Sequence, residues 1–222
     1  MAYGAIDGMR KVLGGIVLSV YGLIANAEQV TIAALGDSLT QGYGLLQQDG
    51  FVPQLQGWLR GQGADVTVIN AGVSGDTTAG GAARVAWTLT PEVDGMIVAL
   101  GGNDLLRGIA PEVSRSNLDK ILAAASQADV DVLLVGMQAP GNYGPEYKAA
   151  FDALYPELAA QYGALYEENF FAGIAGETSD PAGMRKFMQE DGIHPNPEGV
   201  RMIVGVIGPR VLDLVKQIEA AQ

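Results

Sequence analysis

The chain of 222 residues contains no cysteine and only one histidine. The lack of cysteine excludes disulfides, a thiolate nucleophile, cysteine-bound zinc or iron–sulfur clusters, and a lipid anchor on an N-terminal cysteine. A zinc site would have to be completed almost entirely by carboxylates, because only one imidazole is available. We therefore expect neither a metal nor another cofactor, and we expect stability to come from packing.

Positive charge and aromatic side chains are also scarce. The chain has 13 Lys and Arg against 25 Asp and Glu, a formal net charge of −12, and 7% aromatic residues. Such a surface repels phosphate backbones and offers few rings on which bases could stack. We therefore expect no nucleic-acid partner. The 48% of hydrophobic residues indicates a packed globular core.

The first 27 residues differ from the rest and are predicted to be a secretory signal peptide. Two basic residues precede an apolar run at residues 12–24, and Ala25, Asn26 and Ala27 fit the small-x-small rule for cleavage. The run is shorter than the roughly 20 residues of a spanning helix, so an uncleaved anchor is the weaker alternative. Residues 28–222 are expected to form one domain in the periplasm or medium, monomeric or weakly oligomeric and without stable membrane insertion.

Beyond residue 27, apolar runs of strand length alternate with longer segments of helical period. This alternation is typical of a parallel sheet covered by helices on both faces. The expected fold is a three-layer α/β/α structure with a central parallel sheet of about five strands. Strands are predicted at residues 30–35, 66–70, 96–100, 132–135 and 164–166. Helices are predicted at residues 51–60, 79–89, 111–128 and 146–162.

A last helix is predicted from Pro197 toward Lys216. Pro209 should interrupt or kink this helix, because proline lacks an amide proton and its ring clashes with the preceding turn. Residues 172–183 are the most loop-like segment of the chain. In an open parallel sheet, ligands bind outside the carboxyl ends of the strands, so functional residues are expected in the loops that follow the strands.

The loop after the first predicted strand contains Gly36, Asp37 and Ser38. Glycine permits a sharp turn, and a serine at the start of the next helix would direct its hydroxyl into the cleft beside backbone amides. The alternative is that Ser38 only caps the helix, since Asp and Ser are preferred caps. Thr40 follows where the α/β-hydrolase nucleophile elbow requires a second glycine, so that motif is absent.

Two further loops offer hydrogen-bond donors for an oxyanion. After the second predicted strand, Gly72 could bring a bare backbone N–H close to a substrate oxygen. After the third, Asn103 is an amide donor that does not titrate, and the two preceding glycines give it room. Taken singly, each loop is better explained as an ordinary strand-to-helix turn.

The only histidine of the chain, His194, follows Asp191 by three residues and precedes Pro195. Pro195 disfavours helical geometry at His194. Asp191 can accept a hydrogen bond from one ring nitrogen and leave the other free as a base. The alternative is a lone surface histidine.

Serine, glycine, asparagine and an Asp/His pair thus occur in order along the predicted sheet edge. This order resembles that of the SGNH (GDSL) hydrolase superfamily, and most closely its bacterial thioesterase I, lysophospholipase and arylesterase branch. The resemblance is carried by residues 35–39, 74–77, 100–104, 142–144 and 191–195, and it extends over most of residues 30–215. It is weakest at residues 170–183, which leaves the floor of an acyl pocket unassigned.

The resemblance implies a flavodoxin-like fold and an exported serine hydrolase that cleaves small-molecule acyl esters or thioesters. The catalytic triad would be Ser38, Asp191 and His194. The oxyanion would be held by the backbone N–H groups of Ser38 and Gly72 and by the Asn103 side chain.

Substrate contacts are expected from loops that follow the second and fourth predicted strands. The candidates are Asp37, Val73, Ser74, Asn142 and Tyr143. Apolar members of these loops would favour medium or long acyl chains, because each buried methylene adds to binding. Alternatively, these side chains only pack the loops against the sheet. A carbohydrate O-acetyl esterase of the same superfamily and a non-catalytic exported binding protein are the alternative functions.

Overall fold

The computed structural model describes residues 1, 29–177 and 180–221. The predicted signal peptide therefore lies outside the described residues, except for Met1. In the described part, five strands form one parallel sheet in the order β2-β1-β3-β4-β5. They are β1 (Val30–Gly36), β2 (Val66–Gly72), β3 (Gly95–Ala99), β4 (Asp131–Val135) and β5 (Leu165–Glu167). The predicted α/β class and the five-stranded parallel sheet are confirmed.

The central strands are apolar because both of their faces are covered. Every residue of β3 is buried, and β1 and β4 each have only one residue that is not buried. Parallel strands buried on both faces are expected to be near-continuous apolar runs. Their carboxyl ends are level, since Gly36 of β1 lies opposite both Gly72 of β2 and Ala99 of β3. The loops that follow these three strands therefore start at one edge of the sheet.

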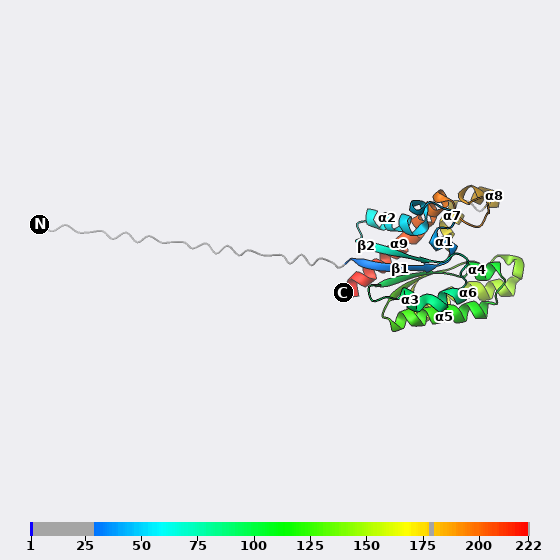
Figure 1. Ribbon diagram of the computed structural model, residues 1–222, viewed down its shortest axis with the longest axis horizontal. Helices are drawn as coiled ribbons and strands as arrows, with labels where there is room; N and C mark the ends of the chain where they lie inside the picture. The colour runs from blue at the N-terminus through cyan, green and yellow to red at the C-terminus, as the bar shows by residue number, and fades with distance from the viewer. Residues whose placement is uncertain (2–28, 178–179, 222) are drawn as a thin grey trace.

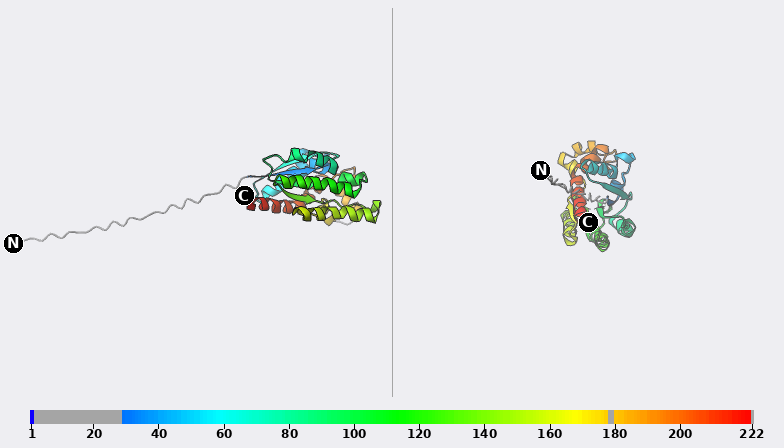
Figure 2. Two further views of the ribbon diagram at one scale, coloured as in Figure 1. Left: turned by 90° about the horizontal axis from the view of Figure 1, so that it is seen from below. Right: turned by 90° about the vertical axis from the view of Figure 1, so that its left-hand side faces the viewer.

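Two layers of helices enclose the sheet (Figures 1 and 2). On one face lie α2 (Phe51–Gly61) and α9 (Pro197–Ala221), and on the other lie α3 (Thr78–Thr88), α5 (Pro111–Gln127) and α6 (Pro145–Tyr162). The α2 and α9 helices approach closely, because a Cβ at Gly208 would lie 2.7 Å from the Trp58 ring. Among the described residues, no helix combines the length and apolarity needed to cross a bilayer.

Short elements occupy the loops. The short α-helices are α1 (Ser38–Gln41), α4 (Gly102–Leu106), α7 (Ala172–Glu177) and α8 (Pro181–Met184). The 3₁₀ turns are η1 (Gln47–Asp49), η2 (Gly141–Tyr143) and η3 (Arg185–Phe187). Most predicted elements differ from the observed ones by one or two residues at their ends, and the fifth strand is shifted by one residue.

The predicted interruption at Pro209 is wrong, because α9 runs from Pro197 to Ala221 without a break. Pro209 and Gly205, the residue four positions earlier, both lie on the exposed side of the helix. Water can therefore bind the Gly205 carbonyl that a proline leaves without an amide partner. The buried side of the same helix contributes residues such as Ile207 and Val211 to the core.

Residues 172–183 were expected to be the most loop-like, whereas most of the described residues there belong to α7 and α8. A single buried side chain, Ile174, anchors α7 in the core. The backbone of α7 also lies close to α9, because a Cβ at Gly173 would clash with the Met202 carbonyl oxygen. A segment of small residues with a single apolar side chain shows no helical periodicity in the sequence. This explains why residues 172–183 were expected to form a loop.

We predict that Gly173→Ala destabilises the fold, whereas Gly176→Ala does not. Both glycines lie in α7, but an added methyl group at Gly176 would meet no atom within 4 Å. Overpacking typically costs about 1–3 kcal/mol, and replacing an unhindered helical glycine by alanine gains roughly 0.5–1 kcal/mol. Urea denaturation of both variants measures the two effects. Equal stability of the two variants would contradict the close approach of α7 to α9.

Candidate active site

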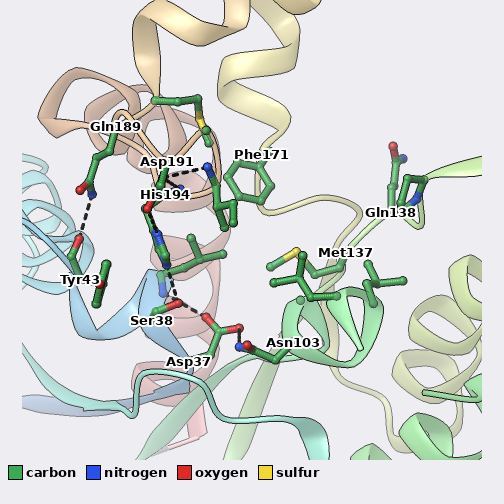
Figure 3. Close-up of a pocket in the computed structure, with 18 of the residues that line it drawn as sticks. Asp37, Ser38, Tyr43, Asn103, Met137, Gln138, Phe171, Gln189, Asp191 and His194 are labelled. Carbon is green, nitrogen blue, oxygen red and sulfur yellow. Dashed lines mark hydrogen bonds and ion pairs between the residues drawn. The ribbon is translucent and has the colours of Figure 1, made fainter. Parts of the chain in front are cut away.

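A large cleft opens at the carboxyl edge of the sheet, where the strand order reverses. The chain moves from β1 to β2 on one side and then to β3 on the other side of β1. Ligand sites of open α/β sheets occur at such a switch point. The cleft has a volume of about 1570 Å³ and is lined by Ser38 after β1 and Asn103 after β3 (Figure 3).

Ser38, His194 and Asp191 form a continuous line of hydrogen bonds at this cleft (Figure 3). Ser38 is the first residue of α1, and its Oγ lies 2.9 Å from His194 Nε2. His194 Nδ1 lies 2.6 Å from Asp191 Oδ2. The structure therefore brings the three predicted triad residues together, although Ser38 and His194 are 156 residues apart.

The Asp191 carboxylate has two separate tasks in this geometry. Its Oδ1 accepts hydrogen bonds from the backbone N–H groups of Ile193 and His194, at 2.9 and 3.0 Å, and so closes the loop. Its Oδ2 accepts from the imidazole. The hydrogen bond from the His194 side chain and the two amides lower the pKa of Asp191 to about 2. Asp191 is therefore a carboxylate over the pH range in which an esterase is assayed.

Tyr43 and Gln189 connect the histidine loop to the segment after α1. The Tyr43 ring lies 4.6 Å from the imidazole of His194, centroid to centroid. Gln189 Nε2 donates to the carbonyl oxygens of Tyr43 and Pro195, at 2.8 and 3.0 Å. These residues limit the movement of His194 relative to Ser38. Nothing in the sequence pattern indicates them, because the partners are 146 residues apart.

Asp37 lies beneath Ser38 and orients the neighbouring groups. It was predicted to contact substrate, and it is among the residues that line the cleft, although the residue is only 1% exposed. Its Oδ1 accepts from the Leu39 N–H at 3.0 Å as the N-cap of α1, and its Oδ2 accepts from Asn103 Nδ2 at 3.2 Å. Burial raises the pKa of Asp37 to about 6, against the lowering effect of these hydrogen bonds. The amide of Asn103 has two N–H groups, so the second is available to the cleft.

Gly72, the predicted oxyanion donor, does not line the cleft. Its N–H donates to Asn70 Oδ1 at 3.0 Å, and a Cβ at this position would clash with the Gln41 backbone. The glycine is thus needed for packing against α1. Gly75, which sequence reasoning missed, lines the cleft instead, and within the described residues its N–H has no hydrogen-bond acceptor.

The turn around Gly75 has a sequence signal that could have identified this residue. Asp76 N–H donates to the Val73 carbonyl at 3.1 Å, and Gly75 has a φ of 84°. A positive φ at the third position is typical of a type II turn, which favours glycine there. The segment Ser74-Gly75-Asp76 carries this signal, whereas Gly72 is the last residue of a strand.

Asp104 joins α4, which carries Asn103, to the start of α3, which follows the Gly75 turn. Its carboxylate is fully buried and accepts hydrogen bonds from the Thr78 N–H at 2.9 Å, the Thr78 hydroxyl at 2.6 Å and the Ser114 hydroxyl at 2.9 Å. Asp104 follows Asn103 in α4, and Thr78 begins α3 directly after the Gly75 turn. The two loops are therefore linked by charge-assisted hydrogen bonds, which are about twice as strong as neutral ones.

The cleft wall includes predicted and unpredicted residues. Ser74, Asn142 and Tyr143 line the cleft as predicted, whereas Val73 is 45% exposed and lies outside the lining. The segment from residue 137 to residue 188 adds an apolar side, part of which falls in residues 170–183, where the sequence left the pocket unassigned. Its members are Met137, Phe171, Ala175, Met184 and Met188. Among the described residues, no group of three or more His, Asp or Glu side chains is placed to hold a metal ion.

Comparison with known proteins shows the family of the chain. Residues 34–202 match the model of the GDSL-like lipase/acylhydrolase family. Esterase TesA of Pseudomonas aeruginosa is 39% identical over 188 residues, which cover 84% of this chain and 90% of that protein. Thioesterase 1/protease 1/lysophospholipase L1 of Escherichia coli K12 is 32% identical over 186 residues, 83% of this chain and 85% of that protein. A crystal structure of TesA has a TM-score of 0.74 at 37% identity and covers 83% of this chain and 99% of that chain.

The fold, the cleft and these relatives define an ester-hydrolysing enzyme of the SGNH hydrolase class. The chain belongs to the GDSL-like lipase/acylhydrolase family, and within that family it is of the TesA type.

We predict that Asp37→Asn removes a pH dependence of stability between about pH 4 and pH 6. Folding raises the pKa of Asp37 from its ordinary value of 3.8 to about 6. The folded protein therefore binds the proton more tightly than the unfolded chain, and the free energy of unfolding falls as the pH rises through this window. Urea denaturation of both proteins at several pH values measures the effect. A constant difference in unfolding free energy across the window would contradict it.

Proposed function

We propose that the chain is an exported serine hydrolase that cleaves carboxylic esters and thioesters of acyl substrates through an acyl-enzyme on Ser38. The observation that carries this proposal is the line of hydrogen bonds from Asp191 through His194 to Ser38 Oγ. A nucleophile, a base and a group that orients the base, each within hydrogen-bond reach of the next, are the requirements for nucleophilic catalysis by serine.

The first step follows from these distances. His194 Nε2 takes the proton of the Ser38 hydroxyl as Oγ attacks the acyl carbonyl carbon. The Asp191 carboxylate keeps the Nδ1 proton of His194 in place, so that Nε2 is the basic nitrogen, and it stabilises the imidazolium that forms. The pKa of Asp191, lowered to about 2, keeps this carboxylate ionised throughout the step.

The attack converts the carbonyl oxygen to an oxyanion that needs hydrogen-bond donors. We propose the backbone N–H groups of Ser38 and Gly75 and the free N–H of the Asn103 amide for this role. Gly75 replaces Gly72 in this set, because Gly72 donates to Asn70 and lies outside the cleft lining. Ser38 also begins α1 on the Asp37 N-cap, so its own N–H lies at a helix N-terminus, where backbone N–H groups lack intrahelical acceptors.

The remaining steps restore the enzyme. The bond from the acyl carbon to the alcohol oxygen or thiol sulfur breaks, and the leaving group takes the proton from His194 Nε2. Water then gives a proton to His194 as it attacks the acyl-enzyme, which releases the carboxylic acid and returns the proton to Ser38. These steps need only the residues described and water.

The apolar side of the cleft supports the proposal that the substrates carry acyl chains of medium or long length. Met137, Phe171, Met184 and Met188 present flexible or aromatic apolar surface to the cleft that Ser38 also lines. Met137 and Phe171 are seen in Figure 3. Methionine adapts to ligands of differing shape because it is unbranched. The relatives named as an esterase and as a thioesterase and lysophospholipase are consistent with such substrates.

Export is the last part of the proposal. It is supported by the basic residues, the apolar run and the Ala25-Asn26-Ala27 segment at the start of the sequence. Cleavage after Ala27 would release the enzyme into the periplasm or the medium.

Ser38→Ala should abolish hydrolysis of p-nitrophenyl esters and labelling by a fluorophosphonate, while the thermal unfolding midpoint stays near that of the wild type. The hydroxyl contributes the nucleophile and little packing. Loss of a triad nucleophile typically costs about 10⁶ in kcat. Ser116→Ala is a control for loss of a serine hydroxyl away from the cleft, because Ser116 is exposed on α5 and lies outside the cleft lining, and this variant should still be labelled. A Ser38→Ala enzyme with near wild-type turnover would refute the proposed mechanism.

Chain-length preference should depend on Met184. For the wild type we expect kcat/KM to rise from acetyl to medium-chain p-nitrophenyl esters and CoA thioesters, by up to about fourfold for each methylene that is buried. Met184→Gln should flatten this rise. Met202→Gln is a matched control, because Met202 is also half-buried but lies outside the cleft lining. A fall in kcat/KM from acetyl upward, with efficient deacetylation of acetylated xylan, would favour a carbohydrate esterase instead.

A further inference from the structure

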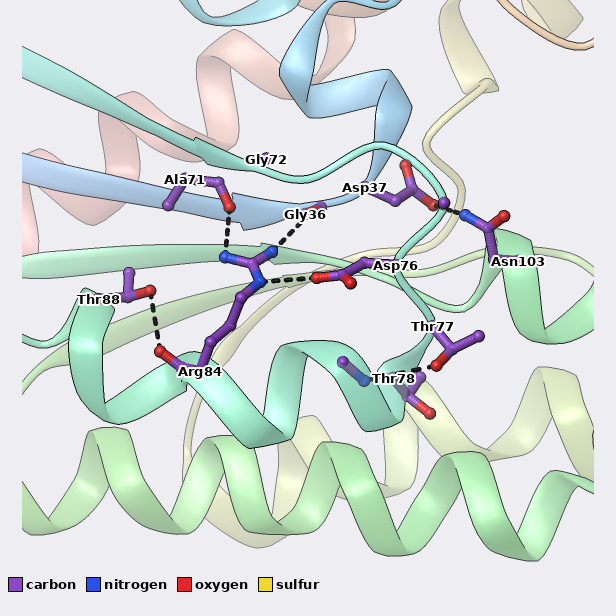
Figure 4. A network of polar contacts seen from close by, with 12 residues as sticks. Gly36, Asp37, Ala71, Gly72, Asp76, Thr77, Thr78, Arg84, Thr88 and Asn103 are labelled. Atoms are coloured by element: carbon purple, nitrogen blue, oxygen red, sulfur yellow. Dashed lines mark hydrogen bonds and ion pairs between the residues drawn. The ribbon is translucent and has the colours of Figure 1, made fainter.

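Arg84 makes three hydrogen bonds that converge beneath the cleft (Figure 4). Its Nε donates to Asp76 Oδ2 at 2.6 Å, its Nη1 to the Ala71 carbonyl at 2.7 Å and its Nη2 to the Gly36 carbonyl at 2.8 Å. The ion pair is largely covered, with side-chain exposures of 22% for Arg84 and 18% for Asp76. All three partners are satisfied by a single guanidinium group from α3.

The three partners belong to the loops that carry the proposed chemistry. Gly36 is the last residue of β1 and is separated from Ser38 only by Asp37. Ala71 lies at the end of β2, and Asp76 follows Gly75 directly. Arg84 therefore ties the Gly75 turn to the ends of the two strands beside the nucleophile.

The direction of the Gly75 N–H depends on this turn. Gly75 has a φ of 84°, and no non-glycine residue of the turn has a positive φ. These angles describe a type II turn, in which the middle peptide is rotated by roughly half a turn relative to type I. In type I, the Ser74 carbonyl would take the place of the Gly75 N–H. The turn therefore presents either a donor or an acceptor to the oxyanion.

Both ends of the turn are held in place. The Val73 N–H donates at 3.0 Å to the same Gly36 carbonyl that Arg84 binds. At the other end, Asp76 is held by Arg84. Gly80 leaves the space for the Asp76 carboxylate, since a Cβ there would clash with it. A helical glycine costs roughly 0.5–1 kcal/mol relative to alanine, so the α3 helix gives up stability where this ion pair forms.

We propose that Arg84 is a positioning residue for the oxyanion hole, which keeps the Gly75 N–H directed into the cleft. The inference rests on the proposed function, in which Gly75 donates to the oxyanion. Arg84 does not line the cleft, and the apolar wall comes from other segments of the chain. Its loss should therefore weaken stabilisation of the transition state without changing the binding of the acyl chain.

The test is Arg84→Met, assayed for kcat and KM with a medium-chain p-nitrophenyl ester. Loss of one oxyanion donor costs about 10²–10³ in kcat, and a displaced donor should cost somewhat less, about 10–100-fold. KM should stay within about twofold, because the interaction exists mainly in the transition state. Inhibition by an alkylboronic acid, which forms a tetrahedral anionic adduct on Ser38, should weaken by the same factor as kcat.

The matched control is Arg115→Met. Arg115 also forms an ion pair with a distance of 2.6 Å, to Glu157, but this pair joins α5 to α6 and lies outside the cleft lining. The Arg115→Met variant should have the kcat and the boronate inhibition of the wild type. Arg84→Lys keeps the charge but cannot donate in three directions from a planar group, so its kcat should fall between those of the wild type and Arg84→Met. If Arg84→Met does not fold, Asp76→Asn should show the same selective loss of kcat.

A double-mutant cycle with Gly75→Ala separates the two proposals. An added Cβ at Gly75 meets no atom closer than 3.9 Å, so this substitution tests the positive φ without a clash. If Arg84 acts through Gly75, the effects of the two substitutions on kcat should be clearly less than additive. Two outcomes would overturn the role of Arg84 and leave Gly75 as the proposed donor. One is a low kcat in Gly75→Ala together with a wild-type kcat in folded Arg84→Met, and the other is strict additivity of the two effects. Wild-type kcat and wild-type boronate inhibition in Gly75→Ala, in folded Arg84→Met and in the double variant would refute the proposed donor itself, because neither loss of the turn's glycine nor loss of its anchor would then affect the oxyanion.

Discussion

The carboxyl ends of β1, β2 and β3 lie at the same level, and the rest of the site depends on this constraint. Gly36 lies opposite both Gly72 and Ala99, so that three loops leave the sheet at one edge. Hydrogen bonds across this edge then define the distances between the loops. Asp104 joins the loops after β2 and β3, and Arg84 joins those after β1 and β2. The histidine loop is added from the start of α9 and is held by Gln189.

The sequence predicted features that depend on local pattern, and it missed features that depend on distant partners. Apolar runs predicted the strands, and the order of Ser38, Asn103, Asp191 and His194 predicted residues that the structure brings to one cleft. The sequence offered two glycines at the end of β2 and in the turn after it, and only the structure shows that the Gly72 N–H is bound to Asn70 whereas Gly75 lines the cleft. The interaction of Gln189 with Tyr43, likewise, leaves no trace in spacing. For α7 and α8, the contacts with α9 outweigh a weak local helical signal.

Two carboxylates near the nucleophile are held in opposite electrostatic environments. Asp191 is partly exposed and accepts three hydrogen bonds, which lower its pKa to about 2. Asp37 is buried, and burial raises its pKa to about 6 despite its two hydrogen bonds. The first environment keeps a negative charge beside the imidazole. The second makes Asp37 easier to protonate than an ordinary carboxyl, so that its negative charge is lost below about pH 6.

The apolar wall and the groups proposed for bond cleavage come from different parts of the chain. Phe171, Met184 and Met188 stand on or beside α7, α8 and η3, which contribute none of the donors or acceptors that link the strand ends. Mutations in this segment can therefore reshape the apolar wall of the cleft while the geometry around Ser38 is kept. Natural selection, or a designer, could thus change which esters the enzyme accepts by small steps, each of which passes through an active protein.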